Sequence, residues 1–426
     1  MKILWLVNII MPELAEHLGK KPSVFGGWLT GAMKAVRESG SELVVCTTSK
    51  DNIGCYEING VTYYISKNGD VPSMQAAFKE VLDAEKPDVV HLYGTEFEHT
   101  WAMASITEPE RTLVSVQGLV SYYADHVFGG VPDTIARDTA LHKLLRSMHK
   151  GGQSIELQRN SYLKRADTEI QTLKRVRYVN GGTAWGDGCA KLIQPDVNLL
   201  QCGLILRDSY YDGRMWNVDN CEKHSIFTIY TYPIKGFDMF LHALKIVVER
   251  YPDTHVYVAG NKCAYRQYEG LKKSIMDAAP DYDWYVQDLI EKYGLKDSIT
   301  FMGFLDEETM HERELKSHVF VSASAIENHS TALGEAMICG VPAVATCVGG
   351  LQEMVDHGVD GFLYPFNETY MLAYYICRIF EDVELAKQFS VKGHEHAART
   401  YNREKNCRKL LEMYETIVKN AKEKEI

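Results

Sequence analysis

Residues 322–337 read Ser322-Ala323-Ser324-Ala325-Ile326-Glu327-Asn328-His329-Ser330-Thr331-Ala332-Leu333-Gly334-Glu335-Ala336-Met337. Residues 319–321 before them are apolar and, with Ser322, typical of a buried strand, and Ser330 is a favourable N-cap for a helix that begins at Thr331. The sequence therefore predicts a strand, a polar loop that carries a carboxylate, and a helix. The free amides at such a helix start can face a phosphate or an oxyanion.

The same alternation of strand and helix extends outward from this segment in both directions. Strands are expected at residues 3–7, 42–46, 61–65, 88–93, 112–116, 176–180, 224–231, 255–259, 298–302, 319–322 and 341–345. Helices are expected between many of them, at residues 28–38, 74–84, 236–250, 282–293, 311–317 and 331–339. Strands separated by helical crossovers predict parallel sheets. We expect an α/β protein with two Rossmann-like, doubly wound domains in tandem, whose ligands bind at the carboxyl ends of the strands and in the cleft between the domains.

A polar stretch divides the two runs of strands. It lies within residues 205–222 and contains several Asp and Asn residues and a glycine, a composition typical of a linker. We expect an N-terminal domain over 1–206, a linker over 207–222 and a C-terminal domain over 223–402. A helix at about 403–421 is expected to pack back on the first domain.

Composition excludes several classes of protein. The chain has 426 residues, 46% of them hydrophobic, and a net charge of -11, and neither half is basic, so a nucleic-acid partner is not indicated. Its ten Cys form no C-x-x-C pair, and no apolar run approaches the ~20 residues that span a bilayer. These features favour a cytoplasmic protein.

Two acidic features can be interpreted from their surroundings alone. Glu335 lies in an apolar helical run, where a charge needs a partner or a ligand, and it could accept hydrogen bonds from both hydroxyls of a ribose. A solvated helix carboxylate is the alternative for an isolated Glu. Asp281 and Asp283 form an Asp-x-Asp that could hold a divalent cation, but they follow Pro280 and open a helix, which favours a capping role.

Glu327 and Glu335 together resemble the Glu-x7-Glu signature of retaining glycosyltransferases of the GT-B fold, specifically glycosyltransferase family 4. Further segments that resemble this family are Gly26-Gly27 and residues 232–236, 340–345, 348–351 and 358–365. Residues 93–96 and 115–120 resemble a branch common in bacterial surface-polysaccharide gene clusters. The resemblance implies two Rossmann-like domains that face a central cleft, and transfer of a sugar from a nucleotide diphosphate sugar to a glycan or lipid-linked acceptor.

The resemblance also implies roles for individual residues. Glu327 and Lys235 would be catalytic, with Lys235 placed against the diphosphate. The expected donor-binding residues are Gly26, Gly27, Lys235, Gly303, Phe304, Glu327, Asn328, His329, Ser330, Thr331, Ala332, Leu333 and Glu335. The expected acceptor residues are Glu96, His99, Gln117 and Tyr122. Tyr122, Tyr123 and Trp101 could stack on sugar faces or pack in a core.

The resemblance further implies a metal-independent reaction without a cofactor and with a UDP- or GDP-sugar as donor. Front-face substitution is the implied mechanism, in which the departing phosphate oxygen takes the acceptor proton. Peripheral contact with the inner face of the membrane is left open.

Some positions depart from the family pattern. Tyr230 stands where relatives carry an Arg, and Lys262 is a candidate substitute for that charge. Asn328-His329 replaces a common Gly-Phe, and Gln117 replaces a His. A nucleotide-sugar-binding protein without transfer, and a GT-B epimerase or phosphorylase, are therefore kept as alternatives. A Rossmann dehydrogenase is less favoured, because no Gly-x-Gly-x-x-Gly follows the first strand.

Overall fold

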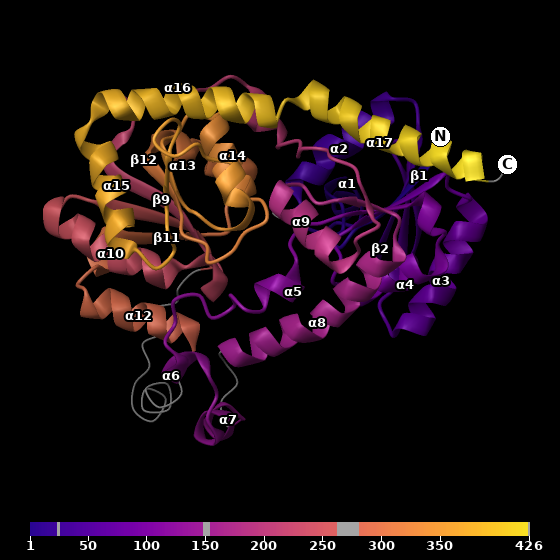
Figure 1. Ribbon diagram of the computed structural model, residues 1–426, viewed down its shortest axis with the longest axis horizontal. Helices are drawn as coiled ribbons and strands as arrows, with labels where there is room; N and C mark the ends of the chain where they lie inside the picture. The colour runs from indigo at the N-terminus through magenta and orange to yellow at the C-terminus, as the bar shows by residue number, and fades with distance from the viewer. Residues whose placement is uncertain (24–25, 148–153, 262–280, 425–426) are drawn as a thin grey trace. The chain divides into compact units, whose positions relative to one another are not determined.

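The computed structural model describes residues 1–23, 26–147, 154–261 and 281–424 (Figure 1). The chain divides into two compact units. Unit 1 comprises Met1–Ser121, Leu163–Asp208 and Thr400–Ile426, and unit 2 comprises Tyr122–Tyr162 and Ser209–Arg399. Each unit is built on its own largely parallel sheet, which confirms the predicted tandem α/β architecture.

The sheet of unit 1 has eight strands within the described residues, in the order β3-β4-β2-β1-β5-β6-β7-β8. Every pairing is parallel except that of β3 with β4. The strands are β1 (Lys2–Leu6), β2 (Glu42–Ser49), β3 (Gly54–Ile58), β4 (Val61–Lys67), β5 (Val89–Tyr93), β6 (Thr112–Ser115), β7 (Tyr178–Asn180) and β8 (Asn198–Leu199).

The edge strand β3 was not expected from the sequence. It forms a hairpin with β4 through Asn59-Gly60, and both of these residues have positive φ (51° and 79°). This two-residue turn is the strongest short-range hairpin signal in a sequence. Residues Gly54–Ile58 are exposed or half-buried along their whole length, so no apolar pattern marked them as a strand.

Helices of unit 1 flank its sheet. They are α1 (Pro12–His17), α2 (Gly27–Glu38), α3 (Val71–Glu85), α4 (Glu98–Ile106), α9 (Ala184–Ile193) and α17 (Arg403–Lys424). The residues of α5 (Val120–Tyr123) and α8 (Ile155–Arg175) are divided between the two units. Figure 1 shows α17 alongside α2 in this unit. The core beneath them contains Trp5, Tyr63 and Tyr414.

The sheet of unit 2 has six parallel strands within the described residues, in the order β11-β10-β9-β12-β13-β14. The strands are β9 (Glu222–Tyr230), β10 (His255–Gly260), β11 (Ile299–Gly303), β12 (Ser317–Ser322), β13 (Ala343–Thr346) and β14 (Phe362–Tyr364). All residues of β12 are buried, as expected for a central strand covered on both faces.

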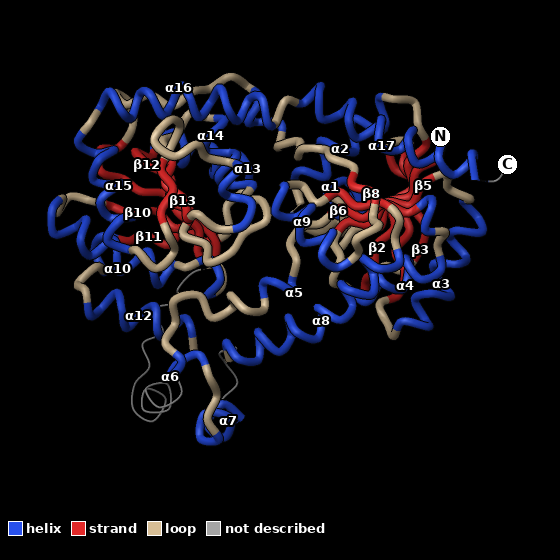
Figure 2. The backbone as a smooth tube through the Cα atoms, in the orientation of Figure 1, coloured by secondary structure: helices blue, strands red, loops and turns tan. Residues whose placement is uncertain are grey.

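Two helical layers cover this sheet. The helices of unit 2 are α6 (Asp133–Ala136), α7 (Ala140–Ser147), α10 (Phe237–Arg250), α12 (Tyr282–Lys292), α13 (Glu307–Lys316), α14 (Thr331–Ile338), α15 (Thr369–Glu381) and α16 (Val383–Thr400). Figure 2 shows α10, α12 and α15 on one side of the strands and α13 and α14 on the other. None of the helices in the described part of the chain is both long and apolar enough to cross a membrane.

Residues 122–162, which the sequence analysis placed with the first domain, are grouped with unit 2. Two glycines account for this attachment, because they let the segment lie directly on the start of α10. A Cβ on Gly129 would lie 2.5 Å from the carbonyl oxygen of Pro233, and a Cβ on Gly130 would lie 2.1 Å from the sulfur of Met239. Only residues without side chains can approach this closely.

The helix α17 is tied to the sheet of unit 1 by a buried polar contact. The hydroxyl of Tyr414 accepts a hydrogen bond from Trp5 Nε1 at 3.0 Å and lies 2.7 Å from Nδ1 of His91. The other ring nitrogen of His91 lies 2.8 Å from the hydroxyl of Ser115. Burial lowers the pKa of His91 to about 3, so this imidazole is neutral at neutral pH.

Replacing Tyr414 by Phe is expected to lower the free energy of unfolding of unit 1 by about 1–3 kcal/mol, because it leaves the buried indole N–H of Trp5 without its acceptor. Urea titration followed by circular dichroism measures this loss. The matched control is Tyr370→Phe in unit 2, whose side chain is exposed and which should change nothing. A Tyr414→Phe protein as stable as the unsubstituted chain would contradict this assignment.

Candidate functional site

Two loops meet at the carboxyl edge of the unit 2 sheet. Lys235 ends a 3-10 turn, Pro233–Lys235, which follows β9, and Glu327 lies in the loop that follows the neighbouring strand β12. The amide of Ala325 donates to the carbonyl of Ile234 at 2.7 Å. Gly236 has φ 65°, and a Cβ on it would lie 1.9 Å from the carbonyl oxygen of Ala323. The two loops are therefore held against each other by their backbones.

This contact brings the two predicted catalytic residues together as an ion pair. Nζ of Lys235 lies 2.5 Å from Oε2 of Glu327, and the hydroxyl of Ser324 donates to the same oxygen at 3.1 Å. Burial alone would lower the pKa of Lys235, but the Glu327 carboxylate outweighs it and the pKa of the ammonium stays above its usual value. Lys235 is thus a cation throughout the physiological pH range.

The peptide group that follows Glu327 is also fixed. The carbonyl of Glu327 accepts from the amide of Gly350 at 2.9 Å, and a Cβ on Gly349 would lie 2.1 Å from that same carbonyl oxygen. The amide of Asn328 donates to the hydroxyl of Tyr123. Glu327 therefore lies on a rigid loop, and its side chain is 11% exposed.

The helix α14 begins where the sequence predicted. The hydroxyl of Ser330 accepts from the amide of Leu333 at 3.3 Å, which confirms its N-cap role. Thr331 and Ala332 in the first turn are half-buried, and Leu333 is buried. Burial lowers the pKa of His329 to about 4, so its ring is neutral at neutral pH.

The remaining predicted donor residues of unit 2 lie at the ends of other elements. Glu335 is one turn inside α14 and only 2% exposed, so it is not a solvated surface carboxylate. Gly303 ends β11 with φ 82°, and Phe304 directly after it is 51% exposed. Because β9, β11 and β12 belong to one parallel sheet, their carboxyl ends share one edge.

Tyr230, at the position where an Arg was expected, does not contribute to the loop surface. It is fully buried, its hydroxyl donates to the carboxylate of Asp283, and its ring packs 5.0 Å from that of Phe237. Asp281 accepts from the amide of Trp284 at 2.8 Å, which confirms that it caps α12. The other candidate cation, Lys262, lies outside the described residues.

Asp238 is a buried carboxylate that the sequence analysis did not single out. It lies in the first turn of α10, three residues after Lys235, and its Oδ1 accepts from the hydroxyl of Tyr282 at 2.8 Å. A Cβ on Gly130 would lie 2.7 Å from its Oδ2. Burial raises the pKa of Asp238 to about 6, against an ordinary value of 3.8.

The predicted glycine loop of unit 1 opens α2. Gly26 is the N-cap with φ 78°, and a Cβ on it would lie 2.4 Å from the side chain of Ile9. A Cβ on Gly27 would lie 2.6 Å from Cδ of Arg207. The structure explains both glycines by close packing, and it places an arginine side chain across Gly27.

Two of the predicted acceptor residues lie just after β5 in unit 1. Oε2 of Glu96 accepts from the amide of Thr95 at 3.1 Å, and Oε1 lies 3.8 Å from Arg165. Burial raises the pKa of Glu96 and lowers that of His99 to about 4. The ring of His99 stacks on that of Phe97 at 5.1 Å.

Glu169 on α8 is a second buried carboxylate near Glu96, and the sequence analysis missed it. It accepts hydrogen bonds from the amides of Val120 and Ser121 and from the hydroxyl of Thr95. Burial raises its pKa. Glu169 is one of several charged residues on the helix Ile155–Arg175, and no spacing in the sequence singles it out.

The other two predicted acceptor residues have separate surroundings. Oε1 of Gln117 accepts from the side-chain amide of Asn8 at 3.3 Å in unit 1. Tyr122 is half-buried and belongs to unit 2.

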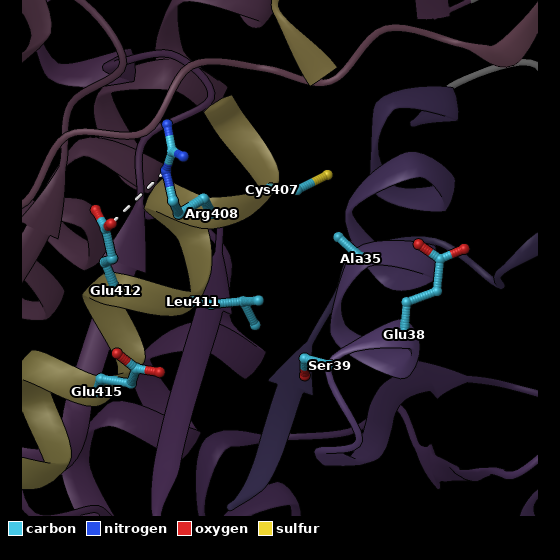
Figure 3. A pocket seen from close by; sticks show the side chains of 8 residues that line it. All are labelled: Ala35, Glu38, Ser39, Cys407, Arg408, Leu411, Glu412 and Glu415. Carbon is cyan, nitrogen blue, oxygen red and sulfur yellow. Dashed lines mark ion pairs between the residues drawn. The ribbon is translucent and has the colours of Figure 1, made fainter. Parts of the chain in front are cut away.

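An open hollow of about 450 Å³ lies elsewhere in unit 1, between α2 and α17 (Figure 3). None of the predicted site residues lines it. Its lining residues are Ala35, Glu38, Ser39, Cys407, Arg408, Leu411, Glu412 and Glu415.

Comparison with known families places the Lys235–Glu327 pair in a recognised domain. Residues 222–396, which hold nearly the whole of unit 2 after the linker, match the family "Glycosyl transferases group 1". A curated relative is the N-acetyl-alpha-D-glucosaminyl L-malate synthase of Bacillus anthracis, 29% identical over 129 residues. That match covers 30% of this chain and 32% of the relative, so the chain aligns with about a third of the relative's length.

Solved structures match over almost the whole chain. Sucrose-phosphate synthase from Thermosynechococcus elongatus has a TM-score of 0.68 at 17% identity and covers 98% of this chain and 99% of its own. Anabaena Alr3699/HepE, in complex with UDP-glucose, has a TM-score of 0.65 at 15% identity, covering 98% of this chain and all of its own. The two parallel-sheet domains therefore have the GT-B fold, as predicted.

The buried carboxylate of Asp238 predicts a specific pH dependence of stability. The pKa of Asp238 is higher in the folded chain than in the unfolded chain, so folding favours the protonated carboxyl group. The resulting stabilisation is fully present below about pH 4 and is lost as the pH rises to about 6. The side chain at position 238 cannot ionise in the variant Asp238→Asn. We therefore expect the free energy of unfolding of this variant, relative to that of the unsubstituted protein, to rise by up to about 3 kcal/mol between pH 4 and pH 7.

Urea unfolding of unit 2 at pH 4, 5, 6 and 7 measures this difference. Asp297→Asn, at an exposed position of the same unit, is the matched control and should show no such trend. A stability difference for Asp238→Asn that stays constant over this pH range would rule the assignment out.

Proposed function

We propose that the protein is a retaining glycosyltransferase that moves a sugar from a nucleotide diphosphate sugar to a glycan or lipid-linked acceptor in polysaccharide or glycoconjugate biosynthesis. The observation that carries this proposal is the Lys235–Glu327 ion pair, held by Ser324 at the carboxyl edge of the unit 2 sheet. The match of residues 222–396 to the group 1 glycosyltransferases supports it. A structural neighbour with UDP-glucose bound supports the choice of donor.

In this proposal Lys235 binds the diphosphate. A diphosphate oxygen would take the place of the Glu327 carboxylate beside the ammonium, and a charge-assisted hydrogen bond of this kind strengthens as negative charge develops on the leaving group. The free amides in the first turn of α14, near Thr331 and Ala332, would add further donors. Lys235 and this helix start would supply the charge compensation, so the proposed reaction needs no metal ion.

Once released from Lys235, Glu327 would accept hydrogen bonds from hydroxyls of the transferred sugar. Its negative charge would also favour an oxocarbenium-like transition state. We propose front-face substitution, in which the leaving phosphate oxygen removes the proton from the acceptor hydroxyl and the anomeric configuration is retained. Glu335 would bind the ribose, and Gly303-Phe304 would contact the base.

In unit 1, Gly26-Gly27 would be the donor-binding glycine loop. The pair Glu96 and His99, both largely buried after β5, is the proposed centre of the acceptor site, and Gln117 and Tyr122 are the other proposed acceptor residues. We also propose that residues 207–222 divide the two domains. The proposed location is cytoplasmic, at or near the inner face of the membrane.

A second candidate function is a nucleotide-sugar-binding protein without transfer. The observation that favours it is Tyr230, whose burial against Phe237 and Asp283 removes the cation expected beside the diphosphate. Measured turnover separates the two functions. A transferase consumes the donor, whereas a binding protein holds it unchanged.

Glu327→Gln is expected to lower transfer or donor hydrolysis by about a hundredfold or more, because the neutral amide no longer stabilises positive charge on the sugar. Release of nucleoside diphosphate from UDP- and GDP-sugars measures the turnover. The control is Glu384→Gln, an exposed glutamate of the same unit whose side chain is 83% exposed. Unchanged turnover in Glu327→Gln would contradict the catalytic role, and no turnover in any form would favour the binding function.

Lys235→Ala is expected to weaken binding of UDP or GDP by about 1.5–3 kcal/mol, the contribution of a hydrogen bond to a charged group. Isothermal titration calorimetry measures the affinity. Lys387→Ala removes an exposed lysine of unit 2 that also pairs with a glutamate and serves as the control. Equal affinities of Lys235→Ala and the unsubstituted protein would exclude Lys235 as the diphosphate ligand.

A further inference from the structure

A segment that precedes the unit 2 sheet by about a hundred residues reaches the loop of Glu327. We call residues 123–130 the strap. At one end of the strap, the hydroxyl of Tyr123 accepts a hydrogen bond from the amide of Asn328, a residue that is only 1% exposed. At the other end, Gly129 and Gly130 lie against Pro233 and the first turn of α10.

The strap is attached at both ends to parts of the proposed donor site. Pro233 begins the turn that ends at Lys235, and Asn328 directly follows Glu327. Tyr162, in the same part of unit 2, lies close enough to Lys235 to interact with it electrostatically. The strap therefore contacts both loops that carry the ion pair, although it precedes the matched family region in sequence.

The hydrogen bond from Asn328 has a direct consequence for Glu327. The peptide group after Glu327 is held through its carbonyl by Gly350 and through the Asn328 amide by Tyr123. This peptide group is therefore fixed at both its carbonyl and its amide. The Tyr123 hydroxyl thus helps to set the orientation of the Glu327 side chain. A phenol that accepts from an amide keeps its own proton available to donate.

We infer that Tyr123 is a positioning residue for binding of the sugar portion of the donor. Its hydroxyl holds the Glu327–Asn328 peptide so that the carboxylate can meet the hydroxyls of the transferred sugar. The inference rests on the proposed function. It is confined to the sugar, because the Tyr123 hydroxyl holds the peptide group next to Glu327, whereas the diphosphate ligand Lys235 belongs to the turn Pro233–Lys235.

The first experiment compares the affinities of UDP and GDP with those of UDP-glucose and GDP-mannose, by calorimetry on the full chain. Tyr123→Phe should leave the affinity for the nucleoside diphosphate unchanged and weaken that for the matching nucleotide-sugar about three- to tenfold, the loss of one hydrogen bond. A merely structural role would weaken both alike. Tyr370→Phe, at an exposed tyrosine on α15, is the control.

A second variant tests the position of the strap without removing the hydroxyl of Tyr123. Gly129→Ala keeps Tyr123 but places a methyl group 2.5 Å from the Pro233 carbonyl oxygen, which must displace the strap. It should weaken the affinity for the nucleotide-sugars, and also that for UDP and GDP, because Pro233 begins the turn that ends at Lys235. A Gly129→Ala protein that binds all four probes normally would overturn the role of the strap.

Hydrogen exchange tests the contact without any ligand. In Tyr123→Phe the amide of Asn328 should exchange at least about tenfold faster, because its acceptor is gone. Unchanged protection of that amide would overturn the inference whatever the donor is. If the unsubstituted protein binds none of the four probes, the proposed function fails instead. If it binds them and Tyr123→Phe keeps the normal ratio of affinities, only the present inference fails.

Discussion

The ion pair between Lys235 and Glu327 depends on one constraint of the backbone, the close contact of the loops that follow two neighbouring parallel strands. Gly236 makes the contact possible, because any side chain there would collide with the carbonyl of Ala323. Parallel strands place their carboxyl ends at one edge, so residues 92 positions apart in sequence meet. The cation, the carboxylate and the helix start at Thr331 thus share a site that no single stretch of sequence contains.

Sequence reasoning predicted the features that an apolar run or a capping residue marks. The buried strands β9 and β12, the Ser330 cap and the Asp281 cap followed from apolar runs and capping residues, and the structure confirms them. It missed residues whose role comes from the contacts that they make in the folded chain. The inward-facing Glu169 is one residue of a helix with many charges, and Ser324 gains its role only from a carboxylate three residues later.

The departure from the family pattern at Tyr230 has a physical explanation in unit 2. Tyr230 belongs to a buried aromatic and acidic cluster with Phe237, Tyr282 and Asp283, next to Asp238. An arginine at position 230 would place a guanidinium in that cluster. This part of the proposed donor site is therefore built from hydrogen-bonded phenols and carboxylates, and the sequence alone showed only that a charge was absent.

The central claim is that Lys235 and Glu327 act on one ligand through their contact with each other. A double-mutant cycle on nucleoside diphosphate affinity, with Lys235→Ala, Glu327→Gln and both changes together, tests it most directly. Residues in contact within one network are expected to show a coupling of about 0.5–3 kcal/mol, and we predict about 1 kcal/mol or more, because without Lys235 the Glu327 carboxylate faces the diphosphate uncompensated. Effects that add within about 0.3 kcal/mol would contradict the account.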